Sequence, residues 1–550
     1  VVRPDAESTK LRIVFDASAR QDELSPSLND CLETGPPLQN LLWNILVKNR
    51  FQSVAISGDI RRAFLQIRVR EEDRDALRFH WVSDINSEKI VTYRFTRVLF
   101  GHTQSPFLLG GTIEEHLNSY QEENPGIISE IRSSIYVDDL ITGGCTEEEA
   151  KDLKETATAV FKAAGFTLHK WHSNVPALEQ QRQVNDEVEL TFAKHQLGVK
   201  KQDTKLLGLA WNKVQDKVSV NFPKSTAPDN TKRSVLHILA SIYDPLGFVS
   251  PLVLTGKVIL REICEKQLSW DQTLPDDLAN RWLKFLSTLP SSIAVNRSLP
   301  FTGKIDSVEL HAFGDASDVG VCAVVYAVVR QKNSTSQGMV AAKSRLAPKN
   351  STIPRKELVS SCMAANLIEN VKEALASLPL KSCHAWSDST TTLQWIKGEG
   401  AYKQYVRNRA NKIQEKTFLN WRYVPGTDNP ADIGTRGIST PNFLSSSLYW
   451  NGPEWLADSE RWPDDPTPRP TKGSETEARK MHEVLGLVAT AADDVLSGLM
   501  DNFSYKKAVR ITAWIRRFCS NINKSDKREG PLTTEEIKAV KLHWVKHVQE

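Results

Sequence analysis

The chain has 550 residues, which is too long for one hydrophobic core, so we expect two to four domains. Hydrophobic residues make up 40% of the chain and charged residues 25%, which is ordinary for globular proteins. The net charge of +3 excludes nucleic-acid binding through overall charge, and any such affinity must come from local basic patches.

The seven cysteines lie far apart and form no C-x-x-C motif. This spacing disfavours a zinc ribbon or a disulfide framework and favours a reducing compartment. The sequence contains no signal peptide and no apolar run of about 18 residues, so we expect no membrane partner. Both ends run straight into folded-looking sequence, and we therefore expect a piece of a longer polyprotein.

Residues 1–175 alternate short β-branched runs with helical patterns. In this region the strand-like run Ser53–Ile56 leads to Asp59 at a predicted strand end. Further on, Asp138 and Asp139 stand side by side in an apolar, β-prone run that Gly143 and Gly144 close. Because Asp is depleted in strands and buried charges need partners, a tight hairpin that brings both acids to one edge resolves the conflict.

A strand-end acid and a two-acid hairpin form the carboxylate set of a template-directed polymerase. Two metal ions about 4 Å apart can activate a 3′-hydroxyl and stabilise a leaving pyrophosphate. The alternative for Asp138 and Asp139 is a solvated turn, and the third acid, Asp59, argues against it.

Four segments follow that predict structure more than chemistry. The run Gly165–Trp171 is either a hairpin near the primer end or an ordinary strand, and residues 176–203 read as a polar surface insertion. Residues 206–222 predict two adjoining strands. Residues 231–289 predict a helical thumb and connection, which Asp244 and Pro245 break into two helices.

A second group of acids lies in residues 300–440. The predicted order is a strand-end Asp, a helical Glu, a second strand-end Asp, and an Asp after a proline-marked turn. These residues are Asp315, Glu357, Asp388 and Asp432. Strand-end Asp residues mostly cap turns, but this order with these element types is that of ribonuclease H folds. Four such carboxylates can hold two Mg²⁺ ions that orient a water toward an RNA phosphodiester.

Between the last two of these acids lies a basic stretch interleaved with aromatic residues. Its members are Lys397, Lys403, Arg407, Arg409, Lys412, Lys416 and Arg422, with Trp395, Tyr402, Tyr405 and Trp421. Such a run is either the solvated face of a helix or a groove that follows a nucleic-acid backbone.

The C-terminal part changes in composition. Residues 446–475 are rich in Pro and Trp, which marks a linker or a segment packed against the preceding domain. Residues 506–550 have helical periodicity and a basic excess. His543 and His547 have no downstream cysteine partners, so no complete zinc site is predicted.

Several motifs together resemble one known family, the BEL/Pao class of LTR retrotransposon polyproteins, also labelled Pao retrotransposon peptidase. Besides the acids, they are Lys10–Ser18, Ser27–Asp30, Gly35–Leu38, Val98–Gly101, Ser105–Phe107, Ser241–Gly247, Asn429–Asp432 and Thr435–Gly437. The resemblance runs from the first residue to about residue 450, and weakly to the end.

The resemblance implies an RNA-directed DNA polymerase, or reverse transcriptase, with associated RNase H activity. By the matched motifs, Arg12 contacts the incoming triphosphate, Phe64 lies under the sugar and excludes a 2′-hydroxyl, and Phe100 lies near the sugar where retroviral enzymes carry Gln. The implied partners are an RNA template, a DNA primer, an RNA–DNA hybrid and deoxynucleoside triphosphates. The implied cofactor is Mg²⁺, two ions per active site, with Mn²⁺ as a substitute. Other polyprotein parts are also implied, with a protease upstream and an integrase downstream.

The predicted fold is multi-domain, α+β and α/β. A right-hand polymerase with fingers, palm and thumb precedes an RNase H-like mixed sheet with flanking helices and a helical C-terminal segment. The predicted parts are residues 1–175 (fingers and palm, truncated at the N-terminus), 176–295 (rest of palm, thumb and connection), 300–445 (RNase H-like), 446–480 (linker) and 481–550 (basic helical start of an integrase region). The expected location is intracellular, in a cytoplasmic virus-like particle, with nuclear access by the DNA product.

Two alternatives stay open. An aspartic peptidase needs a D-[ST]-G tripeptide, and the chain contains none, so any protease would lie outside it. An inactive nucleic-acid-binding remnant of a retroelement is the other, although all seven predicted catalytic acids are present.

Overall fold

The computed structural model describes most of the chain, and every structural statement here concerns that part. It describes residues 15–84, 88–179, 203–223, 229–398, 400–466, 476–478, 499, 503–522 and 527–549. Arg12, most of the fingers motif Lys10–Ser18, nearly all of the predicted insertion 176–203 and most of residues 467–502 lie outside the described residues. The chain divides into two compact units, residues 1–478 and residues 479–550.

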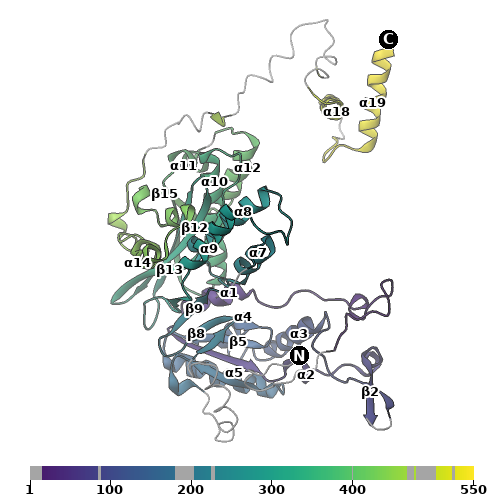
Figure 1. Cartoon of the computed structure of the whole chain (residues 1–550), viewed down its shortest axis with the longest axis vertical. Helices are drawn as coiled ribbons and strands as arrows, with labels where there is room; N and C mark the ends of the chain where they lie inside the picture. Colours follow the sequence, from purple (N-terminus) through teal and green to yellow (C-terminus); the bar gives the residue numbers. More distant parts are fainter. Residues whose placement is uncertain are drawn as a thin grey trace. The chain divides into compact units, whose positions relative to one another are not determined.

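The first sheet of the larger unit has four antiparallel strands in the order β4-β5-β1-β6 (Figure 1). Its strands are β1 (Val54–Ile60), β4 (Ile135–Tyr136), β5 (Asp139–Gly144) and β6 (Leu168–Ser173). The helices of this region are α1 (Leu42–Asn49), α2 (Ala63–Gln66), α3 (Ser105–Asn118), α4 (Pro125–Ser134) and α5 (Glu147–Ala163). Helix α5 begins after Thr146, whose side chain accepts a hydrogen bond from Glu149 N, and it packs on β1, β5 and β6.

A two-stranded hairpin projects from this region (Figure 1). It consists of β2 (Arg78–Asp84) and β3 (Lys89–Arg94), and Trp81 and Ile90 on it are exposed. The position of this hairpin in the chain is that expected of fingers.

A second four-stranded antiparallel sheet connects the two halves of the larger unit, in the order β10-β9-β8-β7. Its strands are β7 (Asp203–Leu206), β8 (Leu209–Asn212), β9 (Lys217–Asn221) and β10 (Ser292–Asn296). Between β9 and β10 the chain forms α7 (Lys232–Ser241), α8 (Ser250–Glu265) and α9 (Asp276–Thr288). The helical character predicted for residues 231–289 and the break at Asp244 and Pro245 are confirmed, but the prediction of two helices is wrong because α8 and α9 both follow the break.

The third sheet has five strands in the order β13-β12-β11-β14-β15. Its strands are β11 (Ser307–Ala316), β12 (Gly320–Gln331), β13 (Ser334–Leu346), β14 (Leu380–Ser387) and β15 (Leu419–Tyr423). The first three are antiparallel, and β14 and β15 run parallel to β11. The long helix α10 (Ile353–Ala374) packs on β11 and β12, and α8 packs on β13, so the predicted mixed sheet with flanking helices is confirmed.

Shorter helices complete this part of the unit. They are α11 (Thr390–Lys397), α12 (Gln404–Gln414), α13 (Ile433–Arg436), α14 (Thr440–Ser445) and α15 (Ser447–Asn451), with 3₁₀ turns η5 (Gly426–Asp428), η6 (Pro430–Asp432) and η7 (Ser459–Arg461). Further 3₁₀ turns are η1 (Asn29–Cys31), η2 (Glu71–Leu77) and η3 (Pro176–Leu178).

The Trp-rich segment after α15 packs against the third sheet as far as residue 466. The ring of Trp386, on β14, lies 5.0 Å from that of Trp455 and 5.3 Å from that of Trp462. Trp462 also meets the ring of His384 edge-on at 4.8 Å. Of the two readings of this segment, the structure therefore supports a packed one over a free linker for its described residues.

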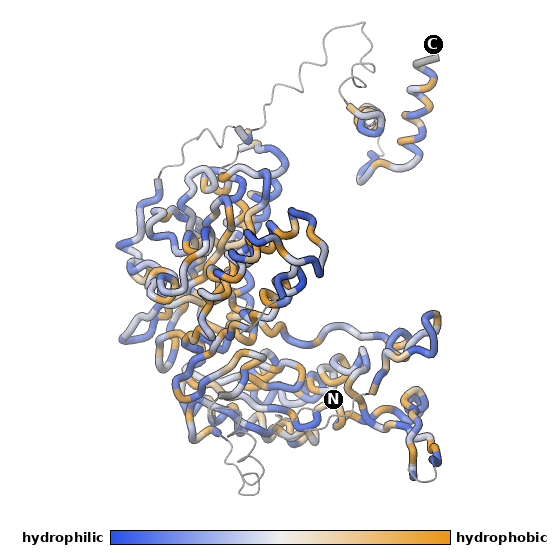
Figure 2. Tube along the Cα trace, in the orientation of Figure 1, coloured by the Kyte–Doolittle hydropathy of each residue, from blue (hydrophilic) through white to orange (hydrophobic). Residues whose placement is uncertain are grey.

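The smaller unit contains the helices α18 (Tyr505–Ile522) and α19 (Thr534–Gln549), which confirms the helical periodicity predicted there. Hydrophilic and hydrophobic residues both occur along α19 (Figure 2). Among the described helices, none combines the length and the apolar run needed to cross a membrane.

Candidate active sites

The first three predicted acids meet on the palm-like sheet. Asp59 is the next-to-last residue of β1, and it pairs directly with Asp139, the first residue of β5. Opposed residues of antiparallel strands have Cα atoms about 4.5–5.5 Å apart. Asp138 occupies the turn between β4 and β5, and its backbone oxygen accepts a hydrogen bond from Ile60 N at 2.8 Å. The structure thus brings the three acids together at one edge.

The turn that carries Asp138 has an unusual backbone. Tyr136 pairs with Asp139, so only Val137 and Asp138 connect the two strands, and Val137 has a φ of 56°. A β-branched residue rarely adopts the left-handed region, and such conformations persist where the surrounding structure imposes them. The tight hairpin predicted from the sequence therefore exists, with local strain at its tip.

The acids interact electrostatically. Burial, then the negative charges of Asp138 and Asp59, raise the pKa of Asp139 to about 7, while the positive charge of Lys170 acts to lower it. Like charges in one site favour the protonated form. The pKa of Asp139 therefore reports that three carboxylates share this edge.

Two residues of β6 that the sequence did not single out contact Asp59. Lys170 Nζ lies 2.8 Å from Asp59 Oδ2, and His169 Nε2 lies 3.7 Å from the same oxygen. Lys170 has a φ of 52°, and the pairing of β1 with β6 shifts register between Ser57 and Asp59. A bulge of this kind redirects side chains, here toward the acid site.

The run Gly165–Trp171 is thus a strand of the palm-like sheet, with Trp171 buried against the backbone of Gly58. A Cβ atom at Gly58 would meet the Trp171 ring at 3.1 Å, so a side chain here would force the ring to shift by a few tenths of an ångström. The strand predicted for this run is confirmed, two of its side chains reach the acids, and its position near the primer end stays a prediction.

The predicted sugar-contact residues Phe64 and Phe100 lie together. Phe64 lies in α2, just after Arg62 with its φ of 52°, and is 6% exposed. Its ring meets that of Phe100 edge-on, with centroids 4.8 Å apart. Arg12, the third predicted substrate contact, lies outside the described residues, and its role stays a prediction.

The four acids of the second group also converge. Asp315 is near the end of β11, Glu357 lies on α10, Asp388 directly follows β14, and Asp432 ends η6. Burial, then Asp388, raises the pKa of Asp315 to about 6, with a smaller contribution from Asp432. Burial also raises the pKa of Asp388 to about 6, with contributions from Glu357 and Asp432. Burial, with a contribution from Asp315, raises the pKa of Glu357.

Each acid of the second group has a polar or charged neighbour that the sequence did not reveal. Thr435 Oγ1 donates to Asp315 Oδ2 at 3.0 Å and lies 2.9 Å from the backbone oxygen of Asp432. The side chain of Asn429 hydrogen bonds to Asp388. Arg436 Nη2 lies 3.1 Å from Asp432 Oδ1.

Ser389 serves both the helix and the site. Its hydroxyl caps α11 by accepting a hydrogen bond from Thr392 N at 3.1 Å, and it hydrogen bonds to Glu357. Hydrogen bonds to the ionised form of a carboxyl group lower its pKa and hold its oxygens in place. These neighbours therefore orient the acids.

Both groups offer the hard oxygen donors that divalent cations prefer. In the ranges that the structure describes, no three side chains of the types His, Cys, Asp and Glu come together closely enough to hold a metal ion as they stand. Burial is the main cause of the raised pKa values, repulsion between the acids of each group adds to it, and a divalent cation would offset that repulsion. The donor chemistry of both groups fits such an ion.

The basic stretch near the second group is partly paired. Lys397 contacts Asp465 at 2.6 Å, and Lys416 is paired with Glu369. Arg422 lies over the Trp462 ring at 5.0 Å. Lys403, Arg407 and Lys412 are exposed at and along α12. Some basic residues of the stretch therefore contact other side chains of the fold, and those of α12 form one exposed basic face.

Two cavities of about 410 and 360 Å³ lie away from both acid groups. The larger is lined by residues of the β8–β9 turn and of the segment 296–302, and the smaller by residues of α11, α12 and β15. Neither is lined by a predicted catalytic acid.

Two regions of the chain match known families. Residues 7–209 match the family described as reverse transcriptase (RNA-dependent DNA polymerase), and residues 231–389 match the Pao retrotransposon-like RNaseH-like domain. The chain thus contains a reverse transcriptase-like region followed by an RNase H-like region. Together the two matches support a fragment of a Pao/BEL-class retrotransposon pol protein. Proteins of these two families generally use divalent metals.

The second match begins at residue 231 and so includes α7, α8 and α9. Helix α8 packs on β13 and α13 of the third sheet. The assignment of these helices to a thumb and connection, like the other predicted domain boundaries, stays a prediction.

Solved foamy viral enzymes resemble the chain. A protease-reverse transcriptase "dRH" in complex with ds DNA has a TM-score of 0.51 at 16% identity, over 77% of this chain and 64% of that one. The foamy viral protease-reverse transcriptase in complex with RNA/DNA hybrid has a TM-score of 0.46 at 15% identity, over 75% of this chain and 49% of that one. The same enzyme in complex with dsDNA has a TM-score of 0.42 at 16% identity, over 70% of this chain and 71% of that one. The first likeness shows a shared fold. This chain spans just under two thirds of that first relative, and it matches no curated protein.

Proposed function

We propose that the chain is an RNA-directed DNA polymerase with an associated RNase H, which copies retrotransposon RNA and degrades the RNA of the resulting hybrid. The observation that carries this proposal is the presence of two separate acid groups. Three acids lie on the β1 edge of one sheet, and four lie on the third sheet and its flanking turns. The two family matches support the same pairing of activities.

At the polymerase site, Asp59, Asp138 and Asp139 would hold two Mg²⁺ ions, with Mn²⁺ as a substitute. When bound, the metals would favour ionisation of the 3′-hydroxyl and stabilise the leaving pyrophosphate. Lys170 offsets part of the negative charge by pairing with Asp59. The packed rings of Phe64 and Phe100 would lie beside the sugar, where a 2′-hydroxyl finds no room, and Arg12 would bind the triphosphate as a bidentate donor.

At the RNase H site, Asp315, Glu357, Asp388 and Asp432 would hold two further Mg²⁺ ions that activate a water for attack on the RNA phosphodiester. The protein's own part is to orient these acids through Thr435, Ser389 and Asn429. Contacts to 2′-hydroxyl groups would select the RNA strand of the hybrid.

The proposed partners are an RNA template, a DNA primer, their hybrid and deoxynucleoside triphosphates. The foamy viral relative was solved with ds DNA, which supports a nucleic-acid partner for this fold. The exposed basic residues of α12 offer a surface for the hybrid backbone. An intracellular site of action, in a cytoplasmic particle, belongs to the same proposal, as do a protease and an integrase elsewhere in the polyprotein.

Primer extension on an RNA template tests the polymerase half. The full chain should extend a DNA primer in the presence of Mg²⁺, and Asp138→Asn should abolish extension because it removes a metal ligand. Asp152→Asn is the matched control, since Asp152 is an exposed acid on α5. Extension by Asp138→Asn within about tenfold of the parent, a difference of roughly 1.4 kcal/mol in barrier, would contradict the assignment.

A further inference from the structure

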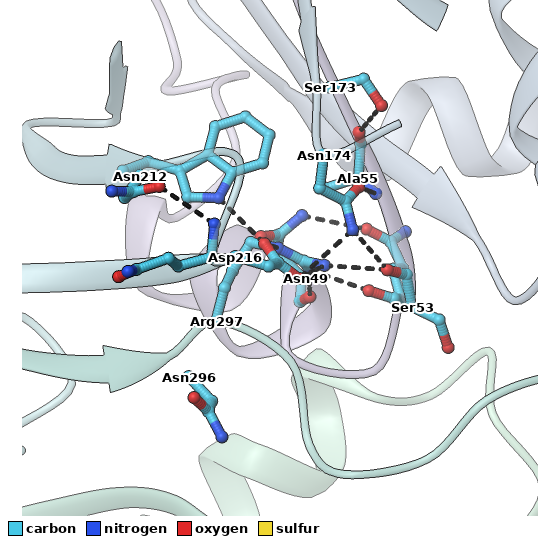
Figure 3. A network of polar contacts seen from close by, with 12 residues as sticks. Asn49, Ser53, Ala55, Ser173, Asn174, Asn212, Asp216, Asn296 and Arg297 are labelled. Atoms are coloured by element: carbon cyan, nitrogen blue, oxygen red, sulfur yellow. Dashed lines mark hydrogen bonds and ion pairs between the residues drawn. The ribbon is translucent and has the colours of Figure 1, made fainter. Parts of the chain in front are cut away.

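A buried network of polar contacts joins the palm-like sheet to the second sheet, which contains β8, β9 and β10 (Figure 3). Its centre is Arg297, which directly follows β10 and has 2% of its side chain exposed. Arg297 Nε and Nη2 donate to Asp216 Oδ1 and Oδ2, each at 2.7 Å. This forked arrangement fixes orientation as well as distance. Asp216 lies in the turn between β8 and β9 and also accepts a hydrogen bond from Trp211 Nε1 at 2.9 Å.

The remaining donors of Arg297 hold the segment between α1 and β1. Nη1 donates to the backbone oxygens of Asn49 and Gln52 at 2.7 and 2.8 Å, and Nη2 donates to that of Ser53 at 3.1 Å. Asn174 secures the same segment, since its Oδ1 accepts from Ala55 N at 2.9 Å and its Nδ2 donates to Ser53 O at 2.9 Å. The backbone that enters β1 is therefore fixed on several sides.

Arg50 extends this network to the third sheet. Its Nη2 donates to the backbone oxygen of Met339, on β13, at 2.7 Å, and its Nη1 donates to that of Asn296 at 2.9 Å. Its guanidinium also lies 4.9 Å from the centre of the Phe248 ring. The backbone of Arg50 takes part as well, because Leu299 N donates a hydrogen bond to Arg50 O at 2.9 Å. We call Arg50, Arg297 and Asp216 the two-arginine clamp.

The charges of the clamp make it resistant to loosening. Burial, with a contribution from Arg297, lowers the pKa of Arg50 to about 9, so this arginine stays charged near neutral pH. A small shift of one sheet against the other that admits no water would leave guanidinium donors and backbone oxygens buried without partners, which is costly. The clamp therefore favours one relative position of the two sheets.

One acid of each group lies on a strand that the clamp reaches: β1 begins directly after the clamped segment, and Met339 pairs through Tyr326 with His311 on β11. Asp59 lies five residues after Val54, the first residue of β1, or roughly 17 Å along the strand. Asp315 lies four residues after His311, or roughly 14 Å along β11. Such short, stiff strands transmit a displacement at the clamp to the acids.

We propose that the two-arginine clamp is a positioning device that sets the distance between the polymerase and RNase H sites, so that the RNA is cut at a constant number of base pairs behind the primer end. The inference rests on the proposed function. A duplex rises about 3.4 Å per base pair. A displacement of the RNase H site by this distance relative to the polymerase site therefore moves the cut by about one nucleotide.

The test is the cleavage register on an RNA–DNA hybrid whose primer end is held by a chain terminator. The wild-type chain should give a narrow set of first cuts. Arg50→Met keeps the apolar contact with Phe248 but removes the donors to Met339 and Asn296, and it should spread the first cuts over several nucleotides. Arg50→Lys keeps the charge with fewer donors and should give an intermediate spread. Primer extension by both variants should stay within about twofold of wild type, because the acids are untouched.

Arg132→Met is the matched control. Arg132 also bonds to several side chains, Glu114, Gln121 and Asn118, but all of them belong to the palm-like half. Its loss tests the general cost of removing a networked arginine, and it should leave the register narrow. A network that only stabilises the fold would lower melting temperature and total activity in both kinds of variant without broadening the register.

The outcomes separate the two proposals. A wild-type chain that neither extends nor cleaves overturns the proposed function. A wild-type chain that cleaves, with Arg50→Met giving the same narrow register, overturns the clamp. If the Arg50 variants do not fold, spin labels on unnatural amino acids at the exposed positions Glu155 and Glu373 of the wild-type chain decide the matter. A single narrow distance distribution supports the clamp, and a broad one overturns it.

Discussion

Replacement of Thr435 by valine would remove one hydroxyl group from the RNase H-like site while leaving the shape of the side chain unchanged. Thr435 is fully buried, and its hydroxyl lies 3.0 Å from Asp315 Oδ2 and 2.9 Å from the backbone oxygen of Asp432. A hydrogen bond to a charged group contributes about 1.5–3 kcal/mol. If this contact is needed to orient Asp315 in the transition state, its loss should slow hybrid cleavage by a factor of about 10 to 150.

The same change should move the pH dependence of cleavage. The Thr435 hydrogen bond favours the ionised form of Asp315, whose pKa is already raised to about 6 by burial and by Asp388. Without the bond the pKa rises further, by about one to two units for 1.5–3 kcal/mol, so the acidic limb should move to higher pH. The assay is the initial rate of hybrid cleavage against pH at limiting Mg²⁺, with primer extension as the internal control.

Thr427→Val is the matched control for this experiment. Thr427 lies in η5 on the same connection, is exposed, and bonds to Asp428, which is not a predicted catalytic acid. It should cleave at the parent rate with an unchanged pH profile. If Thr435→Val behaved in the same way, Thr435 would have no positioning role, and the reasoning from its hydrogen bond would be refuted.

Two further predictions concern the polymerase site. Because the pKa of Asp139 is raised to about 7, extension should fall as pH drops below about 7, and added Mg²⁺ should move this limb to lower pH because metal and proton compete for the carboxylate. Lys170→Met should move the acidic limb of the extension rate to higher pH, since Lys170 lowers the pKa of Asp139. If neither Mg²⁺ nor this substitution moves the limb, the limb does not reflect the protonation of Asp139. Phe64→Ala should raise ribonucleotide incorporation relative to deoxynucleotides by roughly tenfold or more, as pocket enlargement does elsewhere. An unchanged ratio, in a variant that melts as a folded protein, would count against the steric role of this ring.

The acids were predictable from the sequence because each follows a local signal. Asp138 and Asp139 interrupt an apolar run that otherwise reads as a strand, and the only economical solution is a tight turn at a sheet edge. Asp315 and Asp388 end parallel neighbouring strands, so their convergence follows from topology once both strands are assigned. The periodicity of hydrophobic residues and the positions of acids at strand ends were therefore enough to predict most of the fold and both groups of acids.

Other residues escaped because their roles depend on distant partners. Lys170 reaches Asp59 only through a positive φ and a register shift, neither of which leaves a sequence signal in a residue that is not glycine. Arg297 and Asp216 lie 81 positions apart, and nothing local distinguishes their pairing from an ordinary surface charge. Thr435 could have been found, since the motif Thr435–Gly437 follows Asp432 by three residues, which is one helical turn. The choice between a linker and a packed segment for residues 446–475 required the contacts of Trp455 and Trp462.

The central claim is that one chain contains two independent active sites, and a crossed pair of variants tests it most directly. Asp138→Asn and Asp388→Asn are each assayed for primer extension on RNA and for cleavage of a preformed RNA–DNA hybrid, at equal concentrations of folded protein. Asp138→Asn should lose extension and keep cleavage, and Asp388→Asn should lose cleavage and keep extension, because the acids belong to different sheets. Loss of both activities in both folded variants would contradict the account.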